Sequence, residues 1–292
     1  MENTRKPLRK ILEEERKITS LGLPTIEQDF LLTLFLQIFS TNWLRHHLVF
    51  KGGTALKKCY FGKYRFSEDL DFTALSTTPR GPRLENAIKL ICEECEKFIQ
   101  EQANVQLTCT RYVEKDPHPE KQEAFVIRGQ FPWQREPLAK IMVEITFSES
   151  LLLPLTEQAI LHQYPILDHG KIACYSLEEI VLEKLRAILQ HTKKLHERDW
   201  SRSRARDYYD LWHIFRKEKI SIDFYLLEKK CNPKNVGFTS IDDFFDPKMI
   251  QHVERTWDKW LSPLVHDLPI YETVLTNLRE ELFTQHEMLI NS

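Results

Sequence analysis

The stretch from Leu48 to Thr73 constrains the fold more than any other part of the sequence. It begins with three apolar residues, reaches Gly52-Gly53-Thr54 after one lysine, and ends near Ser67-Glu68-Asp69-Leu70-Asp71-Phe72. An apolar run that stops at paired glycines predicts a strand followed by a turn, where the backbone can approach a ligand closely. A helix is predicted directly afterwards, over residues 54–61, ending at Gly62. The amides at the start of such a helix suit phosphate, although a plain strand-to-helix turn is the alternative.

Two aspartates follow the turn on a second predicted strand, Glu68–Thr73. Asp69 and Asp71 are two residues apart, so their side chains share one face of this strand. Two adjacent carboxylates repel each other unless a cation lies between them. Mg²⁺ bound to a triphosphate is a cation of this kind. The pair therefore predicts a metal site, with an ordinary solvent-facing strand as the alternative.

A third carboxylate stands on another predicted strand, Ala139–Phe147. Its apolar residues alternate along the chain, and Glu144 lies on the opposite face with Met142 and Thr146. A single strand glutamate is usually no more than solvent-exposed. Beside the aspartate pair, Glu144 is the best candidate for a third metal ligand.

The remaining pattern predicts an α/β (α+β) chain with two lobes. Residues 1–170 form a core lobe with a mixed sheet, and residues 171–292 form a helical lobe that completes an active-site cleft. Besides the segments above, strands are predicted at 105–113 and 124–131, helices at 25–39, 84–102, 176–190 and 205–215, a surface helix or arm at 2–20, and a turn at Asp116–Pro119. Thr25 is the expected N-cap of the second helix, and Ser176 with Glu179 forms an expected capping box.

Composition excludes several classes of protein. The net charge is −2, so no global field attracts nucleic acid, and any such surface has to be local. The charged first twenty residues contain no secretory signal, and no apolar run is long enough to span a membrane. A reducing cytoplasm with free thiols is expected. Cys92 and Cys95 form a single CxxC on an apolar helical face, which favours core cysteines over a metal site.

Two polar residues interrupt apolar helical faces in the second lobe. Lys184 lies at helical spacing between Ile180 and Ile188, and Asp207 shares a face with Leu211 and Ile214. An unpaired buried ammonium is costly, so Lys184 is expected to reach a carboxylate or a phosphate, unless it extends to the surface. Lys184, Arg204 and Arg206 are the expected partners of Asp207, in a structural ion pair or a pair that faces the nucleotide.

A basic segment connects these two helices. It contains six cations against two acids, with His191, His196 and Trp200 between them; the cations are Lys193, Lys194, Arg198, Arg202, Arg204 and Arg206. Such runs are usually solvated surfaces. The scarcity of acids also fits contact with an RNA backbone.

Taken together, these motifs resemble the nucleotidyltransferase AbiEii/AbiGii toxin family. Its members are toxins of type IV toxin–antitoxin and abortive-infection systems, within the DNA polymerase β-like nucleotidyltransferase superfamily. The resemblance covers roughly residues 25–215; the matching blocks are Phe50–Leu56, Arg65–Phe72, Lys140–Ile145, Glu183–Ala187 and Arg206–Leu211. Threonine at position 54 and glutamate at position 144 replace a serine and an aspartate that are common in the wider superfamily.

The resemblance implies a role for each matching residue. Gly52, Gly53 and Thr54 would hold the triphosphate, helped by Arg65 and Ser67. Asp69 and Asp71 would bind Mg²⁺ or Mn²⁺, with Glu144 as a possible third ligand. Lys184 and Asp207 match two later motifs that complete the active site.

The implied reaction is transfer of a nucleotide from an NTP to an RNA acceptor. The 3′ end of tRNA is the expected acceptor, its modification would stop translation and growth, and an antitoxin would be the protein partner. Lys193, Lys194, Arg198, Arg202 and Arg204 would contact the RNA. Transfer to a small molecule or a protein, and a non-catalytic nucleotide-binding interaction protein, are the alternatives.

Overall fold

The computed structural model describes residues 6–113 and 121–290. The expected turn at Asp116–Pro119 lies outside these residues. The chain divides into two compact units: the first comprises Met1–Glu149 and Leu155–Cys174, and the second comprises Ser150–Pro154 and Tyr175–Ser292.

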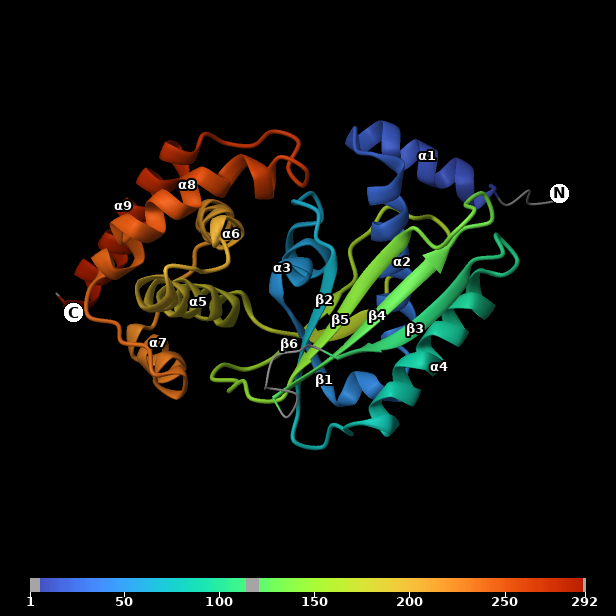
Figure 1. Ribbon diagram of the computed structural model, residues 1–292, viewed down its shortest axis with the longest axis horizontal. Helices are drawn as coiled ribbons and strands as arrows, with labels where there is room; N and C mark the ends of the chain where they lie inside the picture. Colours follow the sequence, from blue (N-terminus) through green and yellow to red (C-terminus); the bar gives the residue numbers. More distant parts are fainter. Residues whose placement is uncertain (1–5, 114–120, 291–292) are drawn as a thin grey trace. The chain divides into compact units, whose positions relative to one another are not determined.

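The first unit is built on a seven-stranded mixed sheet with the order β3-β4-β5-β2-β1-β7-β6 (Figure 1). The strands are β1 (Leu48–Lys51), β2 (Asp69–Ala74), β3 (Gln106–Tyr112), β4 (Gln122–Gln130), β5 (Ala139–Thr146), β6 (Thr156–Ala159) and β7 (Lys171–Cys174). β1 pairs antiparallel with β2 and parallel with β7, while β2 pairs parallel with β5. The prediction of a mixed sheet in an α/β chain is confirmed, but β6 and β7 were not predicted.

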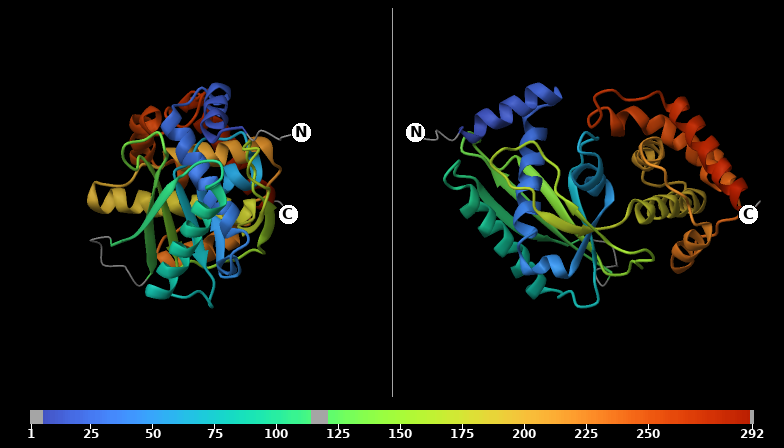
Figure 2. Two further views of the ribbon diagram at one scale, coloured as in Figure 1. Left: turned by 90° about the vertical axis from the view of Figure 1, so that its right-hand side faces the viewer. Right: turned by 180° about the vertical axis from the view of Figure 1, so that it is seen from behind.

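Two helices cover one face of this sheet. α2 (Leu23–Phe39) packs on β5, α4 (Pro82–Ile99) packs on β3, and the two helices contact each other; Figure 2 gives two further views. Phe39 of α2 reaches Phe72 of β2, with ring centroids 5.0 Å apart, and Phe72 also contacts Phe50 of β1. The apolar residues of the central strands therefore point toward the helices, and the side chains between them point to the opposite face.

The helices of this unit differ from the prediction mainly at their ends. α2 begins at Leu23, not at Thr25, because Pro24 fits the first turn and Gly22 occupies the N-cap position without a side-chain bond. α1 (Leu8–Thr19) is a true helix that packs on α2 and buries Leu8, Ile11 and Leu12. Cys92 and Cys95 are buried in α4 as free thiols, which confirms them as core residues.

The predicted helix after the glycine pair is also confirmed. α3 (Gly52–Ala55) starts at the first glycine and continues as a π-helix, η2 (Leu56–Phe61). Gly62 ends it with a φ of 61°, a conformation that favours glycine.

The second unit is helical. Its helices are α5 (Leu177–Arg198), α6 (Ala205–Lys217), α7 (Phe224–Cys231), α8 (Pro247–Leu261) and α9 (Tyr271–Ile290). α6 packs against α8 and α9, and α5 packs against α6, α7 and α8. Within residues 6–113 and 121–290, no helix is long and apolar enough to cross a membrane.

The start of α5 partly matches the predicted capping box. Ser176 Oγ accepts a hydrogen bond from the Glu179 amide at 3.2 Å, as expected. The Glu179 carboxylate does not return to Ser176. It is buried, where it accepts from the backbone amides of Leu152 and Leu153 and pairs with Lys230. The helix also runs to Arg198, eight residues further than predicted.

Candidate active site

The turn after β1 needs glycine at position 52 for two reasons. Gly52 has a φ of 80°, a region that side chains with a Cβ rarely adopt. A Cβ at this position would also collide with the Asp71 carboxylate, since it would lie 3.1 Å from the Asp71 Cγ. The first glycine therefore leaves the space in which a strand carboxylate lies against the turn.

The second glycine leaves space for a cation. A Cβ at Gly53 would lie 3.1 Å from the Cζ atom of Arg65. The Arg65 side chain is buried, and its Nη1 donates to the Phe66 carbonyl at 3.3 Å. Gly52 and Gly53 are both half-exposed. The turn thus places backbone amides, a guanidinium and a carboxylate within one small region.

Thr54 links the turn to the strand that carries the aspartates. Its side chain is fully buried, and Oγ1 donates to the Asp69 carbonyl at 2.5 Å. This bond fixes the beginning of β2 against the beginning of α3. The hydroxyl proton of Thr54 is therefore used to position the carboxylates.

The strand register aligns charged residues across the exposed side of the sheet. Asp71 is paired with Lys51 of β1 on one side and with Glu144 of β5 on the other. Asp69 and Asp71 are half-exposed, while Leu70 and Phe72 between them are buried. Gln122 Nε2 of β4 donates to Glu144 Oε2 at 2.9 Å. The structure thus brings Glu144 next to Asp71, as a third ligand requires.

Lys51 is a charged neighbour that the sequence did not single out. It is buried and lies directly opposite Asp71 in the β1–β2 register. Its place at the polar end of an apolar strand, one residue before the glycines, was the available signal. Only the register shows which carboxylate it faces.

Among the described residues, no group of three or more histidine, cysteine, aspartate or glutamate side chains is arranged to hold a metal ion. Mg²⁺ commonly takes only one or two protein carboxylates and completes its shell with substrate phosphates and water. The Asp69–Asp71 pair, with Asp71 against a turn that leaves no room for a Cβ, fits that kind of site. The donor set is all oxygen, as Mg²⁺ and Mn²⁺ prefer.

A buried ion cluster supports the helix that follows the turn. Lys58 of η2 donates to Asp29 Oδ2 at 2.9 Å and to Thr33 Oγ1 at 2.8 Å, and Tyr164 OH also donates to Asp29. Burial opposes ionisation of Asp29, but the ammonium groups of Lys58 and Lys57 hold its pKa below the usual value. Burial lowers the pKa of Lys57 to about 8, against the attraction of Asp29.

The second unit confirms the predicted ion pair between two helices. Lys184 Nζ of α5 lies 3.0 Å from Asp207 Oδ1 and 2.6 Å from Asp210 Oδ2, both on α6. Arg204 Nη1 lies 3.1 Å from the other oxygen of Asp207. Burial opposes ionisation of Asp207, but Lys184 and Arg204 outweigh it and hold its pKa below the usual value. Asp210, which is fully buried, was not proposed as a partner of Lys184, although its place beside Asp207 on the same helix was a signal.

The basic segment is divided between bonded and exposed cations. Arg204 forms an ion pair with Asp207, and Lys193 donates a hydrogen bond to the Asn235 carbonyl at 2.7 Å. Arg198 and Arg202 are exposed. In the part of the chain that the structure describes, neither of these two guanidinium groups forms a hydrogen bond or an ion pair.

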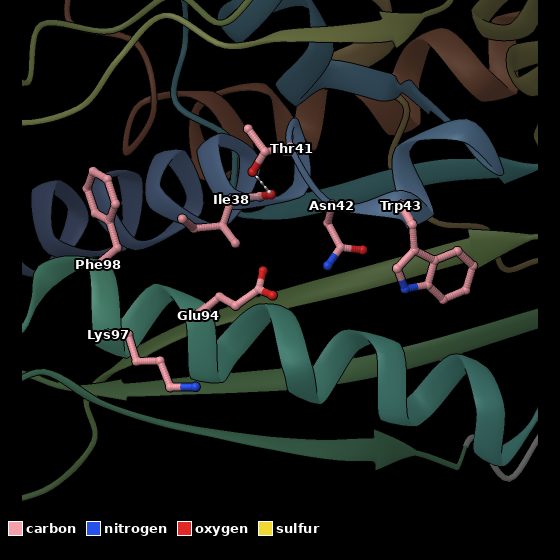
Figure 3. A pocket seen from close by; sticks show the side chains of 7 residues that line it. All are labelled: Ile38, Thr41, Asn42, Trp43, Glu94, Lys97 and Phe98. Atoms are coloured by element: carbon pink, nitrogen blue, oxygen red, sulfur yellow. Dashed lines mark hydrogen bonds between the residues drawn. The ribbon is translucent and has the colours of Figure 1, made fainter.

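A groove of about 660 Å³ lies elsewhere in the first unit (Figure 3). It runs between the end of α2, the following 3₁₀ turn η1 (Trp43–His46) and α4, and it is lined by Ile38, Thr41, Asn42, Trp43, Glu94, Lys97 and Phe98. None of these residues belongs to the glycine turn or to the carboxylate strands. The groove is wide and open, and the candidate chemistry is not in it.

Comparison with known proteins identifies the family of the chain. The family model described as nucleotidyl transferase AbiEii toxin, type IV TA system, matches residues 34–277. Among solved structures, MenT4, a nucleotidyltransferase toxin from Mycobacterium tuberculosis H37Rv, has a similar fold. Its TM-score is 0.62 at 19% identity, covering 95% of this chain and 90% of that chain. No curated protein sequence matches the chain. Since the family model spans most of its length, the chain belongs to the AbiEii nucleotidyltransferase toxins of type IV toxin–antitoxin systems.

Proposed function

We propose that this nucleotidyltransferase toxin transfers nucleotides from an NTP to an RNA acceptor, with the 3′ end of tRNA as the expected target. The observation that carries the proposal is the arrangement at the glycine turn. Asp71 packs on Gly52 and Arg65 packs on Gly53, so a metal-binding carboxylate and a phosphate-binding cation flank the same pair of backbone amides. A triphosphate with its metal ion needs these three elements together.

Each candidate-site residue of the first unit then has a role in this reaction. The backbone amides of the half-exposed Gly52 and Gly53, with Arg65 and the neighbouring Ser67, bind the triphosphate. Asp69 and Asp71 hold Mg²⁺ or Mn²⁺, with Glu144 beside Asp71 in the strand register. Thr54 acts through its bond to the Asp69 carbonyl and keeps β2 in place. A metal ion held there would supply positive charge to the phosphates.

The reaction joins the acceptor hydroxyl oxygen to the α-phosphorus and breaks the bond from that phosphorus to the bridging oxygen. Pyrophosphate leaves, and the hydroxyl proton passes to water. Stabilisation of the charge on the leaving group is the main contribution that the turn makes. The roles of Lys184 and Asp207 rest on their match to two family motifs.

The biological setting follows from the same proposal. An NTP is the substrate and an antitoxin is the partner that type IV membership implies. Nucleotide addition to tRNA would inhibit translation and cell growth. The cytoplasm, where NTPs and tRNA occur, is the proposed location.

Incubation with each of the four labelled NTPs and total RNA tests the proposal. Wild-type protein should label an RNA of tRNA size, with loss of label in EDTA and recovery with Mg²⁺ or Mn²⁺. Asp69→Asn and Asp71→Asn should each lower labelling by at least about 100-fold, because each removes a carboxylate that would hold the metal ion at the reacting phosphates. Glu68→Gln, at the exposed residue directly before β2, is the control for loss of a neighbouring carboxylate.

The outcome separates the alternatives. If wild-type protein releases pyrophosphate but labels RNA with none of the four NTPs, then the acceptor is not RNA but a small molecule or a protein. Undiminished growth inhibition by Asp69→Asn and Asp71→Asn in cells would remove catalysis as the cause of toxicity.

A further inference from the structure

Trp200 stands out on the surface of the second unit. Its side chain is 67% exposed, although a large aromatic residue normally buries most of its area. It follows the C-terminus of α5 directly and lies between Arg198 and Arg202, the two exposed arginines of the basic segment.

The other tryptophans of the unit have ring partners. The ring of Trp257 contacts that of Tyr271. The Arg216 Cζ lies 4.7 Å from the ring centroid of Trp212, and the Arg206 Cζ lies 5.4 Å from that of Trp260. For Trp200, within residues 6–113 and 121–290, there is neither an aromatic neighbour nor a cation over the ring. A ligand can therefore stack on the exposed part of the indole without displacing a ring or a cation of the described residues.

The backbone that carries Trp200 is held on both sides. Asp199 ends α5 in the left-handed conformation, with a φ of 52°, and reverses the chain there. Ser201 is buried, and its Oγ lies 2.7 Å from His191 Nδ1 on the last turns of α5. Burial, followed by the charge of Arg204, lowers the pKa of His191 to about 3, so this contact stays uncharged at neutral pH. An exposed aromatic ring on a fixed backbone loses little entropy when a ligand stacks on it.

We propose that Trp200 is a stacking platform for an unpaired base of the RNA acceptor, with Arg198 and Arg202 contacting the phosphates on either side of that base. An exposed aromatic ring that is flanked in the sequence by two exposed arginines suits a single strand, whose bases are available for stacking. The proposal rests on the proposed function and adds that the acceptor is bound through a single-stranded segment. The recognition is tolerant of sequence, because every base has a face that can stack.

Binding of a short RNA in the absence of metal and NTP tests the platform directly. A fluorescein-labelled single-stranded RNA of 12 nucleotides is titrated with the full-length protein in EDTA, with anisotropy as the signal. Trp200→Ala should raise Kd by about 5- to 150-fold, as expected for one stacked base. Trp200→Phe should restore most of the affinity, and a blunt RNA duplex should bind wild type and Trp200→Ala equally.

Tyr225→Ala is the matched control. Tyr225 is 63% exposed in the same unit, but Lys229 already lies over its ring at 4.4 Å. Its removal should leave RNA binding unchanged. Replacement of Arg198 and Arg202 by glutamine should lower the slope of log Kd against log salt by about 1.4, or about 0.7 for each phosphate contact to a single strand.

The platform is overturned if Trp200→Ala binds the single strand as tightly as wild type, or if Tyr225→Ala weakens binding equally. It is also overturned if Trp200→Ala lowers the affinity for the blunt duplex as much as the affinity for the single strand. The labelling assay keeps the two proposals apart. If RNA binding depends on Trp200 but no label is transferred to RNA, then RNA is not the nucleotide acceptor, while Trp200 still stacks on a base. If label is transferred and Trp200→Ala leaves the KM for RNA unchanged, then the stacking proposal is wrong and the proposed function stands.

Discussion

Replacement of Gly52 by alanine should separate the chemistry of the glycine turn from its stability. At a φ of 80° an alanine costs about 1–2 kcal/mol of unfolding free energy, because its Cβ crowds the backbone in the left-handed region. The added Cβ would also occupy the space of the Asp71 carboxylate. That carboxylate has to move by about 1 Å, and a displacement of that size at a reacting centre lowers the rate by about 100-fold.

Gly81 offers a matched control in the same unit. Its φ is 61°, so alanine is strained there as well, but no atom lies within 4 Å of an added Cβ. Gly81→Ala should therefore lose a similar unfolding free energy and keep its activity. Urea denaturation of both variants gives the stability, and pyrophosphate release with NTP and RNA gives the rate.

Two results for Gly52→Ala and Gly81→Ala would refute this reasoning. If Gly52→Ala and Gly81→Ala have the same activity, then the contact of Asp71 with Gly52 is irrelevant to the chemistry. If Gly52→Ala loses several kcal/mol more than Gly81→Ala, then collapse of the turn, and not movement of a carboxylate, explains any loss of rate.

Two further predictions concern buried ion pairs. In urea denaturation, Lys184→Met should lose about 3–5 kcal/mol of unfolding free energy, because the substitution leaves Asp207 and Asp210 without the ammonium group that they share. A double variant that also carries Asp210→Leu should recover much of this loss. Full activity in that double variant would show that Lys184 is structural. The pKa of Lys57 falls to about 8 from 10.5, so between these values Lys57 binds fewer protons in the folded than in the unfolded protein. The unfolding free energy of the wild type should therefore rise by about 1.6 kcal/mol from pH 8 to 9.5 relative to Lys57→Met. Parallel stability curves for the two proteins over this range would contradict that assignment.

Local patterns in the sequence predicted those parts of the fold that local forces determine. The alternation around Glu144 marked β5, the glycine pair marked the start of a helix, and the misplaced Lys184 correctly predicted an ion pair. α5 was predicted too short, because a basic run resembles a loop. Its last turns are helical, with Lys193 and Glu197 paired at i, i+4.

Non-local pairing accounts for most of what the sequence missed. β6 and β7 have only four residues each, and β6 reads Thr-Glu-Gln-Ala without apolar alternation. These strands exist because β7 pairs with β1, more than a hundred residues earlier. Likewise, the position of Lys51 opposite Asp71 follows from the β1–β2 register, and that of Glu144 from the β2–β5 register.

The pairing of β1 with β7 has a consequence for how this toxin is made. Until Cys174 leaves the ribosome, one edge of the fully apolar start of β1 has no neighbouring strand. At a synthesis rate of about 5–20 residues per second, the delay after Lys51 is roughly 6–25 s. Open strand edges of this kind invite pairing with other chains. A nascent toxin therefore passes through a stage in which the strand leading into its glycine turn is half-formed, and a protein truncated near residue 149 would remain at that stage.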